Sequence, residues 1–210
     1  MKAFLFDFDG TIADSNYVWK KVDEDFFKAR NMSVPKDYVE NISTMSFESG
    51  AIYTKEKYNL KESIEEIMKE WSVYALYEYE NNVKLKPFAK KYIESLKKRG
   101  YKVGLVTASN PEFYTPVLKR EGIFEFFDSF VDGTSGFRNK EYPDMYKGIA
   151  DELNVDYFSC TVYEDVLKGI ISAKSVGMNT VAVYDSSNKD NWVNIKECAN
   201  SYIKSFDELL

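Results

Sequence analysis

The chain has 210 residues, of which 44% are hydrophobic and 30% charged, a composition typical of a soluble globular protein with one substantial core. Its formal net charge of −6 disfavours a nucleic acid or an anionic membrane as the main partner. Because the chain contains no histidine, Ser-His triads, histidine-ligated metals and imidazole acid–base catalysis are excluded. Any catalysis must therefore use carboxylates, lysine, hydroxyls and a hard metal ion.

The N-terminal residues do not resemble a targeting segment or a membrane span. Only Met1 and Lys2 precede a four-residue apolar run, which Asp7 interrupts, whereas a signal peptide or a membrane helix needs a longer apolar stretch. We therefore expect a cytoplasmic protein without a membrane partner. The sequence leaves the oligomeric state open, and a monomer is the default. In a reducing compartment, Cys160 and Cys198 should remain free thiols.

The first predicted element is a strand from Ala3 to Phe8 that runs into two carboxylates. Successive side chains alternate along a strand, so Asp7 and Asp9 should point the same way and repel each other. A positive group should therefore lie between them. Asp9 and Gly10 also form a hairpin signal, but no partner strand follows them.

The next region, to about residue 82, has helical patterns and no predicted strand. An apolar stripe at helical spacing begins at Val18 and ends at Ala29, and Asp14 or Ser15 is expected to cap the start of this helix. The same spacing predicts two further helices, over residues 47–58 and 63–80.

From Pro87 onward, helices alternate with short apolar strands. Pro87 and Gly100 bracket the first helix, whereas Asn110 and Pro111 begin the second. Strands that are apolar on both faces and alternate with helices indicate a parallel sheet covered on each side. The strands are predicted at 101–107, 129–131, 160–163 and 180–184, with helices at 88–99, 110–122, 143–153 and 167–177.

The first strand fits the alternating region better than the helices that follow it. We therefore predict a doubly wound, Rossmann-like α/β core of residues 1–13 and 86–210. An all-helical domain of residues 14–85 is inserted into this core. The two connections, ADSN and NNVKLKP, are rich in turn-forming or polar residues.

Polar residues follow the strands at the edge where doubly wound sheets bind ligands. Crowded carboxylates there need a hard cation, and Mg²⁺ fits best. One carboxylate can attack phosphorus, a second can transfer protons, and a hydroxyl and an ammonium group can hold the phosphoryl oxygens. The residues concerned are Asp7, Asp9, Thr107, Lys140, Glu164 and Asp165.

Each of these residues, taken singly, also has a structural explanation. Glu164 and Asp165 could begin a helix, where the dipole favours acidic residues. Thr107 is an ordinary strand residue and Lys140 an ordinary surface lysine. Their joint placement at strand ends favours a functional site.

Four segments in order, DFDGT, VTASN, RNKEYPDMY and VYEDVLKGIISAKSVGM, resemble the four motifs of the haloacid dehalogenase superfamily. The match is closest to its β-phosphoglucomutase-like branch, in which a helical cap follows the first strand. This resemblance covers nearly the whole chain, because motif order, spacing and the place of the insert all agree.

The resemblance implies a role for each motif residue. Asp7 would be the nucleophile and Asp9 the general acid and base. Thr107 and the backbone N–H of Ala108 would bind the phosphoryl group, and Lys140 would neutralise the phosphate and Asp7.

The same resemblance implies a Mg²⁺ site. Asp165 would be its main acidic ligand, joined by the carboxylate of Asp7 and the backbone carbonyl of Asp9. Glu164 would be a second ligand or an outer-shell partner. Asn139 and Val166 stand where the family often has glycine and serine, which affects only the surroundings of the site.

The implied function is a Mg²⁺-dependent phosphatase that forms an aspartyl-phosphate and acts on a small phosphorylated metabolite, with sugar phosphates as one candidate class. The alternatives are a phosphosugar mutase and a catalytically silent domain that binds a phosphorylated ligand. The mutase uses a cap histidine at or near the position of Trp19, and this chain has none. Dehalogenases of the superfamily do not need the second aspartate, so the presence of Asp9 favours phosphate chemistry. Phosphonate hydrolases of the family form a Schiff base with a cap lysine, and no cap lysine stands out here.

Overall fold

The computed structural model describes residues 1–42 and 45–210. The chain forms two compact units, residues 1–16 with 83–210 and residues 17–82. Within the described residues, no helix combines the length and the apolar composition needed to cross a bilayer.

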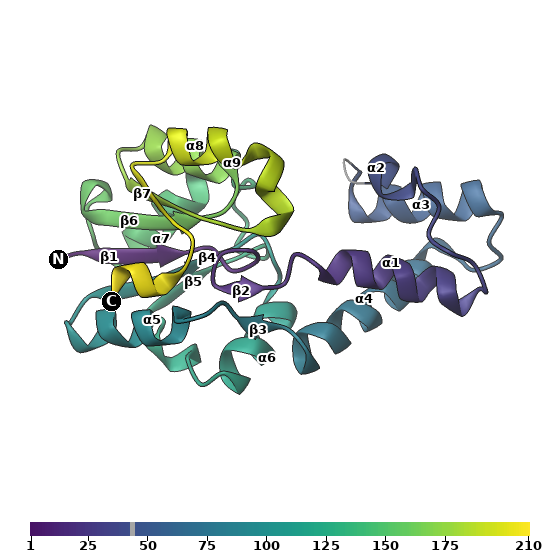
Figure 1. The fold of residues 1–210 in the computed structure, drawn as a ribbon, viewed down its shortest axis with the longest axis horizontal. Helices are drawn as coiled ribbons and strands as arrows, with labels where there is room; N and C mark the ends of the chain where they lie inside the picture. Colours follow the sequence, from purple (N-terminus) through teal and green to yellow (C-terminus); the bar gives the residue numbers. More distant parts are fainter. Residues whose placement is uncertain (43–44) are drawn as a thin grey trace. The chain divides into compact units, whose positions relative to one another are not determined.

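The first unit is built on a parallel sheet, and this confirms the predicted α/β fold class. Its described residues form six strands in the order β5-β4-β1-β6-β7-β8 (Figure 1). The strands are β1 (Ala3–Phe6), β4 (Lys102–Val106), β5 (Ser129–Val131), β6 (Cys160–Glu164), β7 (Asn179–Val183) and β8 (Ser201–Ile203).

The strand order reverses beside β1, and this reversal determines where a ligand can bind. The chain passes from β1 to β4 and β5 on one side, then returns to β6 on the other. Phe6 pairs in register with Leu105 of β4 and Tyr163 of β6. The carboxyl ends of the three central strands therefore meet at one edge, where open α/β sheets bind ligands.

Helices cover the sheet on both faces. One face packs Leu5 and Val162 against Ile149 of α7 (Asp144–Glu152) and Ala173 of α8 (Leu167–Ser175). The other face packs the aromatic ring of Phe6 against other buried rings, including Tyr92 of α5 (Ala89–Lys98). Figure 1 shows α8 and α9 (Trp192–Cys198) on the side of the sheet opposite α5. The remaining α-helix described in this unit is α6 (Pro111–Arg120).

The second unit is helical. Its described helices are α1 (Val18–Ala29), α2 (Tyr38–Ile42), α3 (Phe47–Tyr58) and α4 (Ile64–Asn81). Phe26 of α1 packs edge-on against Trp71 of α4, and both side chains are buried. Ser63 and Glu66 form a capping box that fixes the start of α4, because each side chain accepts a hydrogen bond from the other residue's backbone N–H. Two short antiparallel strands of the first unit, β2 (Ala13–Asp14) and β3 (Lys84–Leu85), pair with each other. They are the segments just before and just after the helical unit in the sequence.

The structure corrects two expectations at the ends of elements. The first strand ends at Phe6 rather than Phe8, because residues 11–13 turn back and donate backbone hydrogen bonds to the Phe8 carbonyl. The cap expected at Asp14 or Ser15 is wrong: α1 begins after Tyr17, without a side-chain cap. Ser15 donates its hydroxyl to Asp9 instead. The sequence patterns also did not predict α2, α9 or β8.

Candidate active site

Asp7 lies directly after β1, at the centre of the sheet edge. Its backbone N–H donates to the Tyr163 carbonyl at 3.0 Å, which extends the pairing of β1 with β6 by one residue. Its side chain is 6% exposed. Asp7 is therefore held by the sheet, with its carboxylate placed where the strand order reverses.

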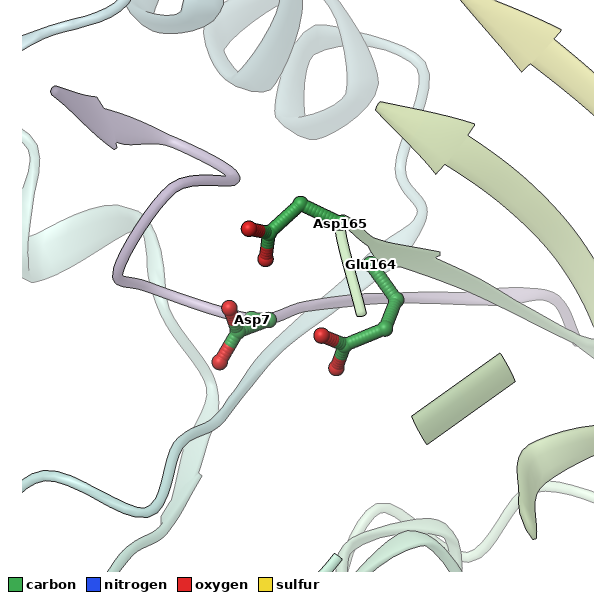
Figure 2. Close-up of side chains that lie close together, drawn as sticks. All are labelled: Asp7, Glu164 and Asp165. Atoms are coloured by element: carbon green, nitrogen blue, oxygen red, sulfur yellow. The ribbon is translucent and has the colours of Figure 1, made fainter. Parts of the chain in front are cut away.

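Two further carboxylates converge on Asp7 from the end of β6. Glu164 is the last residue of that strand and Asp165 follows it, and both are 1% exposed. Each of the three side chains offers an oxygen within 4.8 Å of the others. Figure 2 shows the three carboxylates lying close together. The predicted convergence of distant acidic residues is present in the structure.

Lys140 supplies a positive group beside these carboxylates. Its ammonium contacts Asp7 and also donates to Oε2 of Glu164 at 2.7 Å. The same Glu164 oxygen accepts a hydrogen bond from the buried Tyr146 hydroxyl at 2.9 Å. Oε1 of Glu164 accepts from the Val166 backbone N–H. Glu164 is thus occupied mainly in positioning Lys140, and Lys140 reaches Asp7.

Asp165 is held by a different set of donors. Its Oδ1 accepts from the Thr11 hydroxyl at 3.1 Å, and its Oδ2 accepts from the side-chain amides of Asn16 at 3.3 Å and Asn188 at 2.8 Å. Gly10 permits this close packing, because a Cβ there would lie 2.3 Å from both Oδ2 of Asp165 and Nδ2 of Asn16. The motif glycine is required by sterics at this position.

Asp9 lies outside the group of three carboxylates. Its Oδ1 accepts from the Ser15 hydroxyl at 2.6 Å and its Oδ2 from the Ser109 hydroxyl at 2.5 Å. The positive group expected beside the two aspartates is Lys140, which contacts Asp7. The two described hydroxyl partners of Asp9 can orient a carboxyl in either protonation state.

Thr107 and Ala108 lie at the end of β4, on the loop that carries Ser109. Thr107 is 1% exposed, and its hydroxyl oxygen accepts from the Ser109 backbone N–H at 3.0 Å. Ala108 is exposed. Because Ser109 also contacts Asp9, this loop and the first motif are tied together.

A buried ion pair of Lys86 and Asp185 lies close enough to Asp165 to affect its pKa. Lys86 contacts Asp185 at 2.9 Å and donates to the Tyr184 carbonyl at 2.8 Å. Burial opposes ionisation of Asp185, but hydrogen bonds from Ser187 and Lys86 outweigh it and lower its pKa to about 2. Lys86 therefore faces an ionised carboxylate at neutral pH.

The electrostatics favour a further cation at this site. Burial, and then the negative charges of Glu164 and Asp165, raise the pKa of Asp7, and burial with Glu164 raises the pKa of Asp165 to about 7. Burial alone would lower the pKa of Lys140, but Asp7 and Glu164 outweigh it and raise that pKa. Three carboxylates against one ammonium leave excess negative charge, and their hard oxygen donors fit Mg²⁺.

Several residues of this site were not predicted from the sequence. Asn188 lies after β7, so the strand-end rule that found Asp165 would also have found its loop. Tyr146 and Thr11 carry no local signal, since their contacts are set by the fold.

Comparison with known proteins agrees with the geometry. Hexitol phosphatase B of Escherichia coli (strain K12) is 24% identical over 185 residues, covering 86% of this chain and 82% of the relative. β-Phosphoglucomutase of Bacillus subtilis (strain 168) is 29% identical over 197 residues, covering 87% and 83%. A crystal structure of β-phosphoglucomutase from Clostridium difficile has a TM-score of 0.74 at 24% identity, covering 100% of this chain and 93% of that one.

The family model of haloacid dehalogenase-like hydrolases matches residues 4–183, a range that includes the three carboxylates, Asp9 and Lys140. The parallel sheet and the helical insert after the first strand form the fold that the sequence resemblance implied. The chain therefore belongs to the haloacid dehalogenase-like hydrolase family.

Proposed function

We propose that the protein is a Mg²⁺-dependent phosphatase that hydrolyses a small phosphorylated metabolite through an aspartyl-phosphate. The observation that carries this proposal is the separation of two carboxyl groups of the first motif. Asp7 lies among Glu164, Asp165 and Lys140, whereas Asp9 is held by two serine hydroxyls. Such different surroundings suit a nucleophile and a proton donor.

In the proposed first step, an Asp7 oxygen attacks phosphorus and the ester P–O bond breaks. The departing alkoxide takes the proton of Asp9, so an alcohol leaves. In the second step, Asp9 accepts a proton from water as the water oxygen attacks phosphorus. The acyl phosphate bond breaks, and Asp7 and orthophosphate are released.

Around the reacting phosphoryl group, the Thr107 hydroxyl and the Ala108 backbone N–H would donate hydrogen bonds to its oxygens. Lys140 would neutralise charge on both the phosphate and Asp7. These groups can act without large rearrangement because Thr107 is buried and Lys140 is held by Glu164.

Asp7, Asp165 and the Asp9 backbone carbonyl would hold the metal ion, which when bound supplies positive charge to the phosphoryl oxygens. Oδ1 of Asp165 accepts one described hydrogen bond and keeps a lone pair available. Both oxygens of Glu164 are already hydrogen-bonded. We therefore place Glu164 among the partners of Lys140 rather than among the metal ligands.

The proposed substrate class is the phosphorylated sugars and sugar alcohols. Hexitol phosphatase B supports this class by its name. The helical unit of residues 17–82 is the proposed specificity domain, inserted as a cap into the catalytic core. Hydrolysis is favoured over phosphoryl return to the sugar because the chain has no histidine to replace the one that assists the mutase.

The test is turnover of an aryl phosphate and of a panel of sugar phosphates, with Mg²⁺ and after its removal by a chelator. We expect orthophosphate release that requires the metal and falls by about 10³-fold or more in Asp7→Asn, because this substitution removes the nucleophile. Activity that survives both changes would contradict the mechanism. An isomeric sugar phosphate without orthophosphate would identify a mutase.

A further inference from the structure

Asp23 of α1 differs from the other buried carboxylates. It is 8% exposed, and among the described residues no hydrogen-bond donor or cation contacts its side chain. In contrast, Asp132 accepts from Tyr114 and Thr134, and Glu78 accepts from Tyr17 and Asn82. A buried carboxylate without a partner is costly, and a bound cation would remove this cost.

The side chain of Asp23 lines a cavity of about 490 Å³ that lies within the helical unit. Val34 and Val39 supply apolar surface, and Lys20 and Glu24 complete the lining. A cavity of this size can hold a small organic group. The lone buried carboxylate therefore faces a space that a ligand can enter.

The chemistry of the lining selects the kind of ligand. Among the described residues, two carboxylates and one ammonium line the cavity, which disfavours an anion. Lys20 and Glu24 are exposed and lie 3.9 Å apart, so Lys20 does not neutralise Asp23. A hard metal ion would need several oxygen ligands, whereas Val34 and Val39 offer only hydrocarbon.

Tyr38 of α2 is the ionisable group that faces Asp23 from another helix, and its hydroxyl is already bonded to Thr54 at 2.9 Å. It therefore does not serve as the partner of Asp23. The remaining requirement is a cation with an apolar body. Its charge would pair with the carboxylate, and its methylenes would contact the two valines.

We propose that this cavity binds a primary alkylammonium group, with the ammonium on Asp23 and the alkyl chain against Val34 and Val39. Nothing in this inference depends on the catalytic mechanism. The ammonium group could belong to a free amine or to an aminated phosphate ester, and both present the same chemistry to the cavity.

The first experiment is an NMR titration of the full chain with n-butylammonium chloride at pH 8, observing the methyl groups of Val34 and Val39. We expect saturable shifts, at least about tenfold weaker binding in Asp23→Asn, and binding within about threefold of the parent in Glu24→Gln. 1-Butanol, the neutral comparison, should bind at least about tenfold more weakly than the amine.

The control Glu24→Gln is matched, because it removes one carboxylate from the same lining and the same helix. Absence of saturable shifts would overturn the proposal. Equal affinity of the parent protein for the amine and the alcohol would also overturn it, and this comparison needs no variant. Equal affinity of the parent and Asp23→Asn for the amine would overturn it as well.

A second arm distinguishes the two sources of the ammonium group. If the cavity accepts the ammonium group of a phosphate ester, 2-aminoethyl phosphate should give saturable shifts of the same valine methyl groups, and Asp23→Asn should weaken this binding. If only a free amine binds, n-butylammonium should give these shifts and 2-aminoethyl phosphate should not. Because the titration needs no turnover, it also remains decisive if the proposed phosphatase activity is wrong.

Discussion

Charge at individual residues explains why two motif aspartates, two positions apart, can differ in chemistry. Asp7 is surrounded by charged groups, with Lys140 on one oxygen and two carboxylates nearby. Asp9 contacts the hydroxyls of Ser15 and Ser109. An ammonium favours an ionised carboxylate, whereas a hydroxyl can donate to the ionised form or accept from the protonated one. Asp9 can therefore hold and release a proton without losing its position.

This difference predicts how Asp9→Asn behaves with different leaving groups. An alkyl phosphate should lose about 10²–10⁴-fold in kcat/KM, because its alkoxide needs a proton as it departs. An aryl phosphate with a low leaving-group pKa should lose much less in the first step. The measurement is kcat/KM for a series of esters in parent and variant.

Ser15→Ala is the matched control for that series. It removes one of the two described hydroxyl partners of Asp9 and leaves the carboxyl in place. The decrease in kcat/KM should therefore be small and nearly independent of the leaving group. An Asp9→Asn variant with the same loss for every ester would argue against proton donation by Asp9.

Among the elements, the turn after β1 controls the geometry of the acidic group. Gly10 has φ = +73°, a conformation that other residues rarely adopt, and it also lies against the side chains of Asp165 and Asn16. Gly10→Ala should therefore lower the free energy of unfolding by about 1–3 kcal/mol and weaken Mg²⁺ binding. Chemical denaturation and a metal titration measure the two effects.

Gly100 provides a control for the backbone contribution alone. It has φ = +76° at the end of α5, and a Cβ there would meet no atom within 4 Å. Gly100→Ala should thus cost about 1 kcal/mol of stability and leave Mg²⁺ affinity unchanged. Equal metal affinity in the two variants would show that Gly10 matters only for the turn.

Long periodic elements were predictable from the sequence and short ones were not. The pattern that begins at Val18 and the pattern over residues 47–58 gave the bounds of α1 and α3, because several turns of helix repeat the apolar spacing. The helix α2 (Tyr38–Ile42) is too short to repeat it. The strand β8 has two exposed residues of three, so no apolar run marks it.

The site was predictable where strand ends supplied a rule. Asp7, Glu164 and Asp165 were expected to meet because parallel strands end at one edge, and the structure brings them together. The donors to these carboxylates were not predicted. Asn16 reaches Asp165 across 149 positions of sequence, and no local pattern encodes such a contact.

At the scale of the whole molecule, one buried carboxylate makes the stability of the helical unit depend on pH. Burial, and then the charge of Glu24, raise the pKa of Asp23 from 3.8 to about 7. Below about pH 4, the carboxyl is protonated in the folded and unfolded chain alike. As pH rises from 4 to 7, the unfolded chain ionises first, so the free energy of unfolding falls. Above about pH 7, Asp23 is ionised in both states, and the decrease in the free energy of unfolding stays constant.

Asp23→Asn removes this penalty and should stabilise the helical unit in the same pH window. We expect no pH-dependent gain from this carboxyl below about pH 4, and a gain that grows to about 1–3 kcal/mol near pH 8. Hydrogen exchange of α1 and α4 amides, measured without added amines, reports this unit directly. Glu24→Gln should show a smaller gain, because Glu24 is exposed. Equal stabilisation at all pH values would mean that the Asp23 carboxyl has the same pKa in the folded and the unfolded chain, which would contradict the raised pKa.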